Sequence, residues 1–289
     1  RVETGIPVWH DDQQGTATVM LAGLINALKI VGKKISNVRF VLNGSGAANV
    51  ANARLLFAYG AKPEAIIVVD SRSILHPGRK DIEEKKEEHP EKWKFCQITN
   101  TEKRTGGLTE ALKGADVLIS YSGLGPGVIS PEQIKLMTKD AICFICANPI
   151  PEIWPWEAKD AGAKIVATGR SDFPNQVNNS MGFPAIFRGV FDVGARAITD
   201  DMCIAAAEAL AKYAEERGMS EEYIIPTMGE PEAYICEAVA VGMEAQKEGI
   251  ARVKISREEL RKRSESMISN ARKQHDALVK ASCIAPAVT

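Results

Sequence analysis

Short, continuously apolar runs alternate with longer segments of helical composition over the first two thirds of the chain. Apolar runs of about four to eight residues, bounded by turn residues, are typical of strands that are buried on both faces. Five runs have this character, at residues 38–42, 65–69, 115–120, 141–146 and 163–167. Because strands that alternate with helices form parallel sheets, we predict an α/β fold with a doubly wound parallel sheet.

Helices account for most of the remaining chain. An apolar helix at residues 15–32 precedes the first strand, and residues 79–94 are dense in Lys and Glu, which indicates a solvated surface excursion. The helices expected between the strands cover residues 47–59, 107–113, 131–137 and 152–161.

No further strand is predicted after about residue 200. Helical composition at residues 205–213, 232–248 and 256–282 indicates a C-terminal helical extension. We therefore predict three parts: a lead-in helix with a polar motif at 1–33, a sheet domain at 34–200 and the helical extension at 201–289.

The turn after the first predicted strand, at residues 43–49, is rich in glycine. Gly44 allows a tight turn, and Gly46 lets the backbone approach a pyrophosphate at the N-terminus of the following helix, where unpaired N–H groups favour anions. Asp70 ends the next strand, where an acid accepts hydrogen bonds from a ribose hydroxyl. Two glycines alone also occur in ordinary turns, and Asn49 replaces the usual third glycine. The complete context favours a dinucleotide site in a Rossmann-type domain.

Three polar clusters follow predicted strands, and ligands of such sheets bind beyond the carboxyl ends of the strands. They are Asn148-Pro149, the amide-rich loop at residues 172–179 and the loop at residues 123–127. Amide side chains can bind a carboxylate or a carboxamide, because each offers donors and an acceptor. Turn formation explains Asn148 equally well. The adjacent pair Asn178 and Asn179 favours ligand contact.

A histidine and two carboxylates, His10-Asp11-Asp12, stand ahead of the first predicted helix. Either aspartate could cap that helix by accepting from its free backbone N–H groups, and capping is the default interpretation. The pair could also bind a hard divalent cation, but such a site needs further protein oxygens, and no acidic cluster stands nearby in the sequence.

Composition is that of an ordinary globular protein. The 289 residues are 45% hydrophobic and 25% charged, and a formal net charge of −1 gives no support to binding of nucleic acid or of an anionic membrane. The most apolar segment, 17–31, is interrupted by Asn26 and Lys29, so it is a core helix and not a membrane span. No signal peptide is visible, and because the chain begins with Arg1 we expect a fragment or a processed product.

Six cysteines are scattered through apolar segments. Cys143 and Cys146 have the spacing of a redox or zinc pair, but residues three apart in a strand point to opposite faces. We therefore predict buried, reduced thiols and a cytoplasmic protein.

Four segments, taken together, resemble the malic enzymes, and most strongly their compact bacterial and archaeal type. The segments are residues 6–16 (IPVWHDDQQGT), 44–48 (GSGAA), 147–149 (ANP) and 168–179 (TGRSDFPNQVNN). They occur in the order and spacing of that family, and the resemblance covers about residues 6–250. Malic enzymes oxidise malate with NAD or NADP and a divalent Mg²⁺ or Mn²⁺, and then decarboxylate the intermediate to pyruvate.

The resemblance implies a role for each matched residue. Asp12 matches the metal-ligand aspartate of the family and Asp11 its neighbour, which replaces the capping interpretation. Asn148 and Asn179 match amides that contact the substrate and nicotinamide region, and Asn178 lies beside the cofactor. The dinucleotide site is matched by Gly44, Ser45, Gly46, Ala47, Ala48, Asp70, Ser71 and Arg72. Asp70 favours NAD by repelling a 2′-phosphate, whereas Arg72 and Arg79 could neutralise one, so NAD is only slightly preferred.

The family's catalytic Tyr and Lys, and a Glu-Asp pair of metal ligands, have no match in this chain. The resemblance therefore implies the NAD(P)-binding portion of a homo-oligomeric malic enzyme, expected to bind metal weakly and to turn over little malate without its partner domain. Three alternatives remain: a malolactic-type decarboxylase domain, a non-catalytic NAD(P)-binding module, and another dehydrogenase such as an amino-acid dehydrogenase. The last two leave Asp11-Asp12 unexplained.

Overall fold

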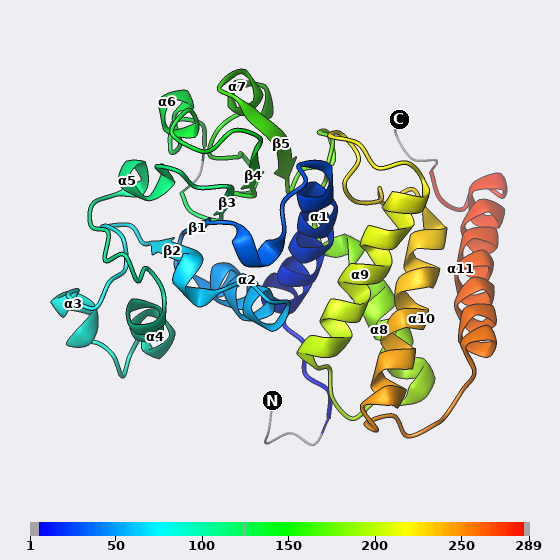
Figure 1. Cartoon of the computed structure of the whole chain (residues 1–289). Helices are drawn as coiled ribbons and strands as arrows, with labels where there is room; N and C mark the ends of the chain where they lie inside the picture. Colours follow the sequence, from blue (N-terminus) through cyan, green and yellow to red (C-terminus); the bar gives the residue numbers. More distant parts are fainter. Residues whose placement is uncertain (1–5, 124, 286–289) are drawn as a thin grey trace.

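Five parallel strands form one sheet in the order β2-β1-β3-β4-β5, as the alternation of strands and helices predicts. The computed structural model describes residues 6–123 and 125–285; Arg1 and Leu124, which belong to the predictions above, lie outside these ranges (Figure 1). The predicted strands are confirmed with ends shifted by at most two residues. They are β1 (Phe40–Asn43), β2 (Ile66–Val69), β3 (Val117–Ser120), β4 (Ala141–Ile145) and β5 (Ala163–Thr168).

Alternate residues of the strands enter two hydrophobic cores, one on each face of the sheet. Phe144 of β4 belongs to the core under α1 (Thr16–Ile30) and α2 (Ala47–Ala58), whereas its neighbours enter the other. That second core is covered by three short helices: α5 (Leu108–Leu112), α6 (Pro131–Ile134) and α7 (Pro155–Asp160). The continuous apolar runs of the sequence therefore have the expected cause, because both faces are buried.

The cysteine pair behaves as the strand geometry predicts. Cys143 lies in one core and Cys146 in the other, and both are unbonded and buried. Burial raises the pKa of each thiol to about 12, so neither is a thiolate that would bind zinc or attack a disulfide at neutral pH.

Two predictions about surface segments need correction. Residues 79–94 are not simply solvated: they contain α3 (Lys80–Glu83) and the start of α4 (Pro90–Ile98), and Arg79 is buried. The helix expected at 152–161 begins only at Pro155, because a proline disfavours helical backbone at the residue before it, and Trp154 is extended. Glu152 lies before the helix and is wholly buried.

The C-terminal helices pack on the same side of the molecule as α1 (Figure 1). The predicted extension is confirmed as α9 (Asp200–Glu216), α10 (Pro231–Lys247) and α11 (Arg257–Lys280), with an unpredicted helix, α8 (Phe183–Val193), packed against α10. One continuous core runs from α1 and the sheet into these helices as far as Leu260. The division at residues 33 and 200 stays a prediction.

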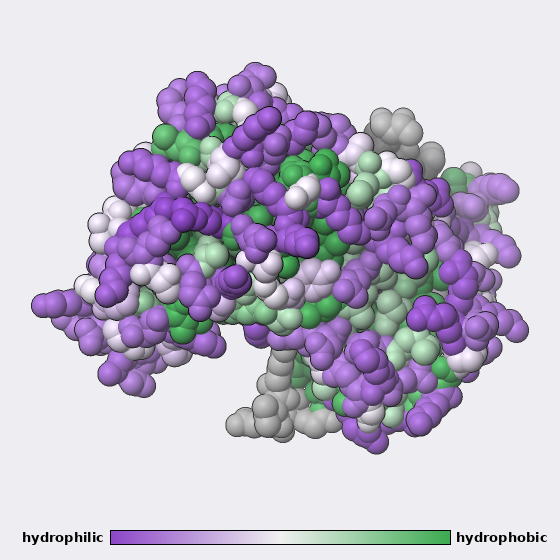
Figure 2. All heavy atoms as spheres, viewed as in Figure 1, coloured by the Kyte–Doolittle hydropathy of each residue, from purple (hydrophilic) through white to green (hydrophobic). Residues whose placement is uncertain are grey.

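The outer surface is mostly hydrophilic on the face seen in Figure 2, with apolar side chains in scattered patches. Among the described residues, no helix combines the length and the apolar character needed to cross a bilayer.

One acid is buried without a partner inside this helical part. Glu237 on α10 is fully buried, and neither carboxylate oxygen has a hydrogen-bond partner among the described residues. Burial raises its pKa well above the usual 4.5. The unfolded chain therefore releases this proton at a lower pH than the folded chain does.

We expect Glu237 to make the free energy of unfolding fall as the pH rises above about 4.5, by up to about 1.4 kcal/mol per pH unit until its folded pKa is passed. Urea unfolding of the Glu237→Gln variant should lack this slope, whereas the exposed control Glu88→Gln should keep it. Parallel pH profiles for wild type and Glu237→Gln would contradict the expectation.

Candidate functional site

The order of the strands reverses between β1 and β3, so the chain leaves their carboxyl ends toward different sides and opens a crevice there. The turn that follows β1 carries the predicted glycines, and Tyr121 follows β3. The two turns are tied by a hydrogen bond from the Tyr121 N–H to the Asn43 carbonyl, 3.0 Å long. The predicted dinucleotide residues therefore stand at the crevice in which ligands of such sheets bind.

Gly44 and Gly46 have different structural reasons to be glycine. Gly44 has a φ of +102°, and a Cβ atom there would lie 2.5 Å from the Tyr121 carbonyl oxygen, so no other residue fits. Gly46 has an ordinary φ of −80° and caps α2, and nothing lies within 4 Å of the place of its missing Cβ. The first glycine thus shapes the turn, and the second leaves open space above the helix N-terminus. The residues that follow it, Ala47 and Ala48, form the first turn of that helix.

Asn49 braces the glycine turn instead of interrupting it. Its buried side-chain amide donates hydrogen bonds to the carbonyls of Asn43 and Gly44, at 3.0 and 2.9 Å. Asn52 in turn donates to the Asn49 side-chain oxygen at 3.0 Å. The departure from the three-glycine pattern is therefore a different way of holding the same turn.

Asp70 is held by Arg79 at the end of β2. The two side chains are 7% and 9% exposed, and their shorter contact, Nη2 to Oδ2, is 2.9 Å. Burial alone would raise the pKa of Asp70, but hydrogen bonds from the Arg79 guanidinium and from the N–H groups of Ser73 and Arg72 outweigh it and lower the pKa. Asp70 therefore lies where the sequence predicts an acid, but its negative charge is already balanced by Arg79.

From the sequence alone, Arg79 and Arg72 share a possible role in neutralising a phosphate, but the two side chains differ in burial. Arg79 is buried and also pairs with Asp81, with Nε 2.8 Å from Oδ1, so it is a structural cation. The side chain of Arg72 is 72% exposed and makes one ion pair, also with Asp81. Arg72 and the exposed Ser71 are therefore the groups at this corner that face solvent.

Asp11 does not cap the first helix, so the default interpretation is wrong. Asp11 and Asp12 lie within a single π-helical turn, Asp11–Gly15, that leads into α1, and no side chain caps it. The Asp11 carboxylate instead accepts hydrogen bonds from Trp9 Nε1 at 3.0 Å and from Asn179 Nδ2 at 2.7 Å. Burial raises its pKa.

The polar motif by itself does not amount to a metal site. Asp12 is exposed, and its carboxylate makes no hydrogen bond or ion pair with any residue that the structure describes. Within residues 6–123 and 125–285, however, no three His, Cys, Asp or Glu side chains are grouped to hold an ion. The described residues could supply only part of the ligands that a divalent cation needs.

Two of the three predicted amides, Asn148 and Asn178, line an open cavity of about 620 Å³ beyond β4 and β5. Asn148 lies at its wall, exposed and without a hydrogen-bond partner among the described residues. Asn178 also lines it, but its amide donates to the Gly169 carbonyl at 3.0 Å and its oxygen caps a 3-10 turn. Asn179 is not at the wall; it links this loop to Asp11.

Several residues of this cavity were not singled out from the sequence. Arg170 donates to the Pro149 carbonyl at 2.8 Å and pairs with Asp172, which fixes one rim. Met228, from the loop between α9 and α10, also lines the cavity. The Ser180 hydroxyl donates to its sulfur at 3.1 Å. No local pattern marks Met228, because it reaches the cavity only through tertiary packing.

Glu152 is a second residue that the sequence did not reveal. Its buried carboxylate accepts from Ser120 Oγ at 2.6 Å, from the Ser122 N–H at 3.1 Å and from the Ala147 N–H at 3.2 Å. One side chain thereby joins the carboxyl ends of β3 and β4.

Comparison with known proteins decides the family. Residues 13–246 match the family model described as "Malic enzyme, NAD binding domain". The chain belongs to the malic enzyme family.

Individual relatives agree with this assignment. The chain is 42% identical over 266 residues to a bifunctional malic/malolactic enzyme of Bacillus subtilis, covering 92% of this chain and 62% of that protein. It is 43% identical over 250 residues to an NAD-dependent malic enzyme of Geobacillus stearothermophilus, covering 86% and 50%. The crystal structure of Entamoeba histolytica malic enzyme matches with a TM-score of 0.95 and 50% identity, over 99% of this chain and 59% of that one.

The chain therefore spans about half to two thirds of the length of these relatives. The Rossmann-type α/β fold and the oxidoreductase family are confirmed, and the match is to the part of the family that binds the dinucleotide. Other relatives of similar identity are named NADP-dependent malic enzymes, so the names include both dinucleotides.

We expect Arg79→Met to lower the free energy of unfolding by about 3 kcal/mol at pH 7, because it leaves the buried Asp70 carboxylate with only the distant ammonium of Lys92, at 4.0 Å. The lowered pKa means that the pair stabilises the fold above the unfolded pKa of 3.8 and that this is lost as the pH falls. The difference from wild type should therefore shrink in urea unfolding below about pH 3.8. A difference that stays constant with pH would contradict this account, and Arg72→Met is the exposed control.

Proposed function

We propose that this chain is the NAD(P)-binding part of a malic enzyme that converts malate to pyruvate and CO₂ by oxidation followed by decarboxylation. The observation that carries the proposal is the match of residues 13–246 to the NAD-binding domain of that family, joined to an open glycine turn at the switch point of the sheet. The remaining assignments are proposed for single residues.

The dinucleotide lies along the β1–β3 crevice in this proposal. Its pyrophosphate sits over Gly46, where the free N–H groups of the first turn of α2 point outward. Ser45, Ala47 and Ala48 complete that cradle. Asp70 faces the adenosine ribose, with Ser71 and Arg72 beside it. Because Arg79 already balances Asp70, the acid repels a 2′-phosphate less than a free carboxylate would, and Arg72 is available to attract one.

Malate and the nicotinamide meet at the cavity beyond β4 and β5. Asn148 offers an unpaired amide there and is proposed to bind the substrate. Asn178 shapes the wall beside the cofactor, and Asn179 positions Asp11 next to the substrate region. The nicotinamide supplies the hydride acceptor when it is bound.

Asp12 is the metal ligand that this chain contributes, with Asp11 as its neighbour. A Mg²⁺ or Mn²⁺ ion would supply Lewis acidity, and the remaining ligands and the acid–base groups come from another part of the enzyme or from a second copy of the chain. We infer that the chain alone binds the ion weakly and turns over little malate.

The two glycines provide a matched test of the cofactor site. Gly46→Ala should melt within a few degrees of wild type, because open space surrounds its Cβ and only the N-cap preference for glycine over alanine is lost. It should nevertheless weaken NADH binding by at least about tenfold by blocking the pyrophosphate. Gly44→Ala should instead lower the melting temperature, because its Cβ meets the Tyr121 carbonyl. Fluorescence titration with NADH and thermal melting measure both. Unchanged NADH affinity in a folded Gly46→Ala protein would contradict the position proposed for the pyrophosphate.

Titration with NADH and NADPH, followed by a malate assay with Mn²⁺, tests the function itself. We expect dinucleotide binding, weak Mn²⁺ binding that Asp12→Asn abolishes, and malate oxidation at least about 100-fold below that of a full-length relative, since general acid–base catalysis alone contributes about 10²–10⁴-fold. Robust turnover by the purified chain would show that the acid and base lie within these 289 residues.

A malolactic outcome is the second candidate, because one relative is named a bifunctional malic/malolactic enzyme. Product analysis of the complete enzyme separates the two: pyruvate with net reduction of the dinucleotide, or lactate without it.

A further inference from the structure

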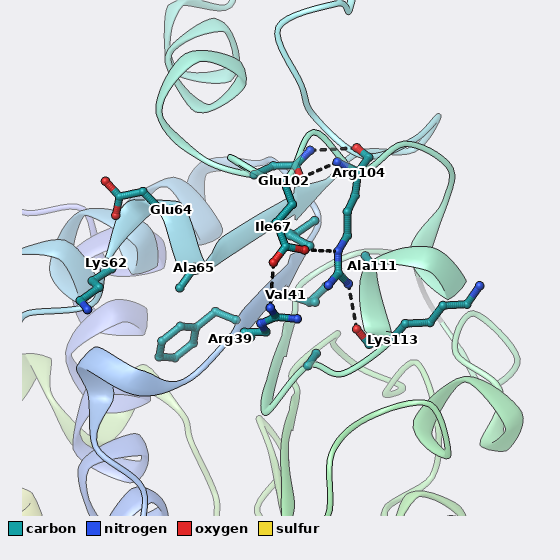
Figure 3. A pocket seen from close by; sticks show the side chains of 13 residues that line it. Arg39, Val41, Lys62, Glu64, Ala65, Ile67, Glu102, Arg104, Ala111 and Lys113 are labelled. Atoms are coloured by element: carbon teal, nitrogen blue, oxygen red, sulfur yellow. Dashed lines mark hydrogen bonds and ion pairs between the residues drawn. The ribbon is translucent and has the colours of Figure 1, made fainter.

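A second cavity lies at the amino-terminal ends of the strands, whereas the crevice lies at their carboxyl ends. It has a volume of about 210 Å³ and opens at the amino-terminal ends of β1 and β2 (Figure 3). It exists because the crossover from β2 to β3 covers this face of the sheet with only the short helix α5. Val41, Ile67 and Ala111 form an apolar floor.

The walls of this cavity carry an excess of positive charge. Four cations, Arg39, Lys62, Arg104 and Lys113, line it together with two carboxylates, Glu64 and Glu102, which leaves two positive charges unbalanced. This is a local feature, because the chain as a whole has a formal net charge of −1.

Arg39 and Arg104 together bind a carboxylate, that of Glu102. Its carboxylate lies between the guanidinium groups, 2.7 Å from Arg39 Nη2 and 2.8 Å from Arg104 Nε. Arg104 also donates to the Lys113 carbonyl at 2.8 Å, which holds its side chain in place. Each guanidinium keeps N–H groups with no partner among the described residues, so both can bind a further acceptor.

The lysines extend this charge to both sides. Figure 3 shows Lys62 and Lys113 on opposite sides of the Arg39–Glu102–Arg104 group. Neither ammonium makes a hydrogen bond or ion pair within the part of the chain that the structure describes. Positive groups at two ends of an apolar floor are complementary to a molecule with a carboxylate at each end and a short carbon chain between them.

We propose that this cavity binds a small dicarboxylate, with Arg39 and Arg104 as its principal ligands and Lys62 and Lys113 at its ends. The site is separate from the proposed cofactor and substrate region, and the inference does not rest on the proposed function. Glu102 competes with the ligand for the two guanidinium groups.

Isothermal titration of the purified chain with succinate, in EDTA and without dinucleotide, tests the site. We expect saturable binding of one succinate per chain, at least about tenfold tighter than that of acetate, because acetate carries one carboxylate. Inorganic phosphate should also bind at least about fivefold more weakly than succinate, because it leaves the apolar floor uncovered.

Variants assign the binding to this cavity. Arg39→Gln should weaken succinate about tenfold or more, and Arg39→Lys should restore part of that loss. The Arg39 side chain is half exposed, so both variants should fold, which thermal melting checks. Glu102→Gln should tighten succinate severalfold by removing the competing carboxylate, a change that a purely structural role for Glu102 does not predict. Arg263→Gln, on α11, is the matched control, because Arg263 is also half exposed and also pairs with a glutamate, and it should leave the affinity unchanged.

Each other result overturns the proposal. Absence of saturable succinate binding removes the site, and phosphate binding as tight as succinate removes the dicarboxylate assignment. Loss of binding in Asn148→Ala, with Arg39→Gln unaffected, places succinate in the cavity beyond β4 and β5 instead. Because dinucleotide is absent, these results are independent of whether the chain binds NADH.

Discussion

The contact between the turn after β1 and the turn after β3 constrains where this protein can hold a ligand. Gly44 approaches the Tyr121 carbonyl so closely that no side chain fits, and the Tyr121 N–H bonds the carbonyl of Asn43. This contact lies at the point where the strand order reverses. The contact fixes the path of the chain from β1 into α2, and so places the open N-terminus of α2 beside the crevice.

The polar half of the site depends on a contact between distant segments. Asn179 and Asp11 are 168 residues apart, and their hydrogen bond joins the amide-rich loop to the motif ahead of α1. Glu152 performs a related task between β3 and β4. Buried acceptors of this kind keep loops in register because leaving such a carboxylate unpaired is costly.

Local patterns in the sequence predict those parts of the protein whose cause is local. The strands were predictable because both faces are buried, and the glycine turn because its neighbours complete a known layout. Glu152 was assigned to a helix and Arg79 to a solvated surface because their partners, Ser120 and Asp70, are distant in sequence or lie across a turn. The family resemblance is the only source of the proposed metal-ligand role of Asp12, because the residues alone favoured capping. Met228 had no signal that sequence spacing could carry. By contrast, α8 has apolar residues at helical spacing, with Ile186, Val190 and Val193 on its buried side, so it was predictable but missed.

The helix α1 has a consequence for how the chain is made. Asn26, buried on α1, donates to the carbonyls of Ala211 and Ile224, which lie 185 and 198 residues later. At about 5–20 residues per second, a ribosome needs roughly 10–40 s to synthesise that interval. Within this chain, α1 is thus synthesised well before α9, which packs against it, and the side of α1 that faces α9 stays uncovered during that interval. Apolar surface that is exposed in this way during synthesis is prone to aggregate, so the contact between α1 and the C-terminal helices also protects the chain once it forms.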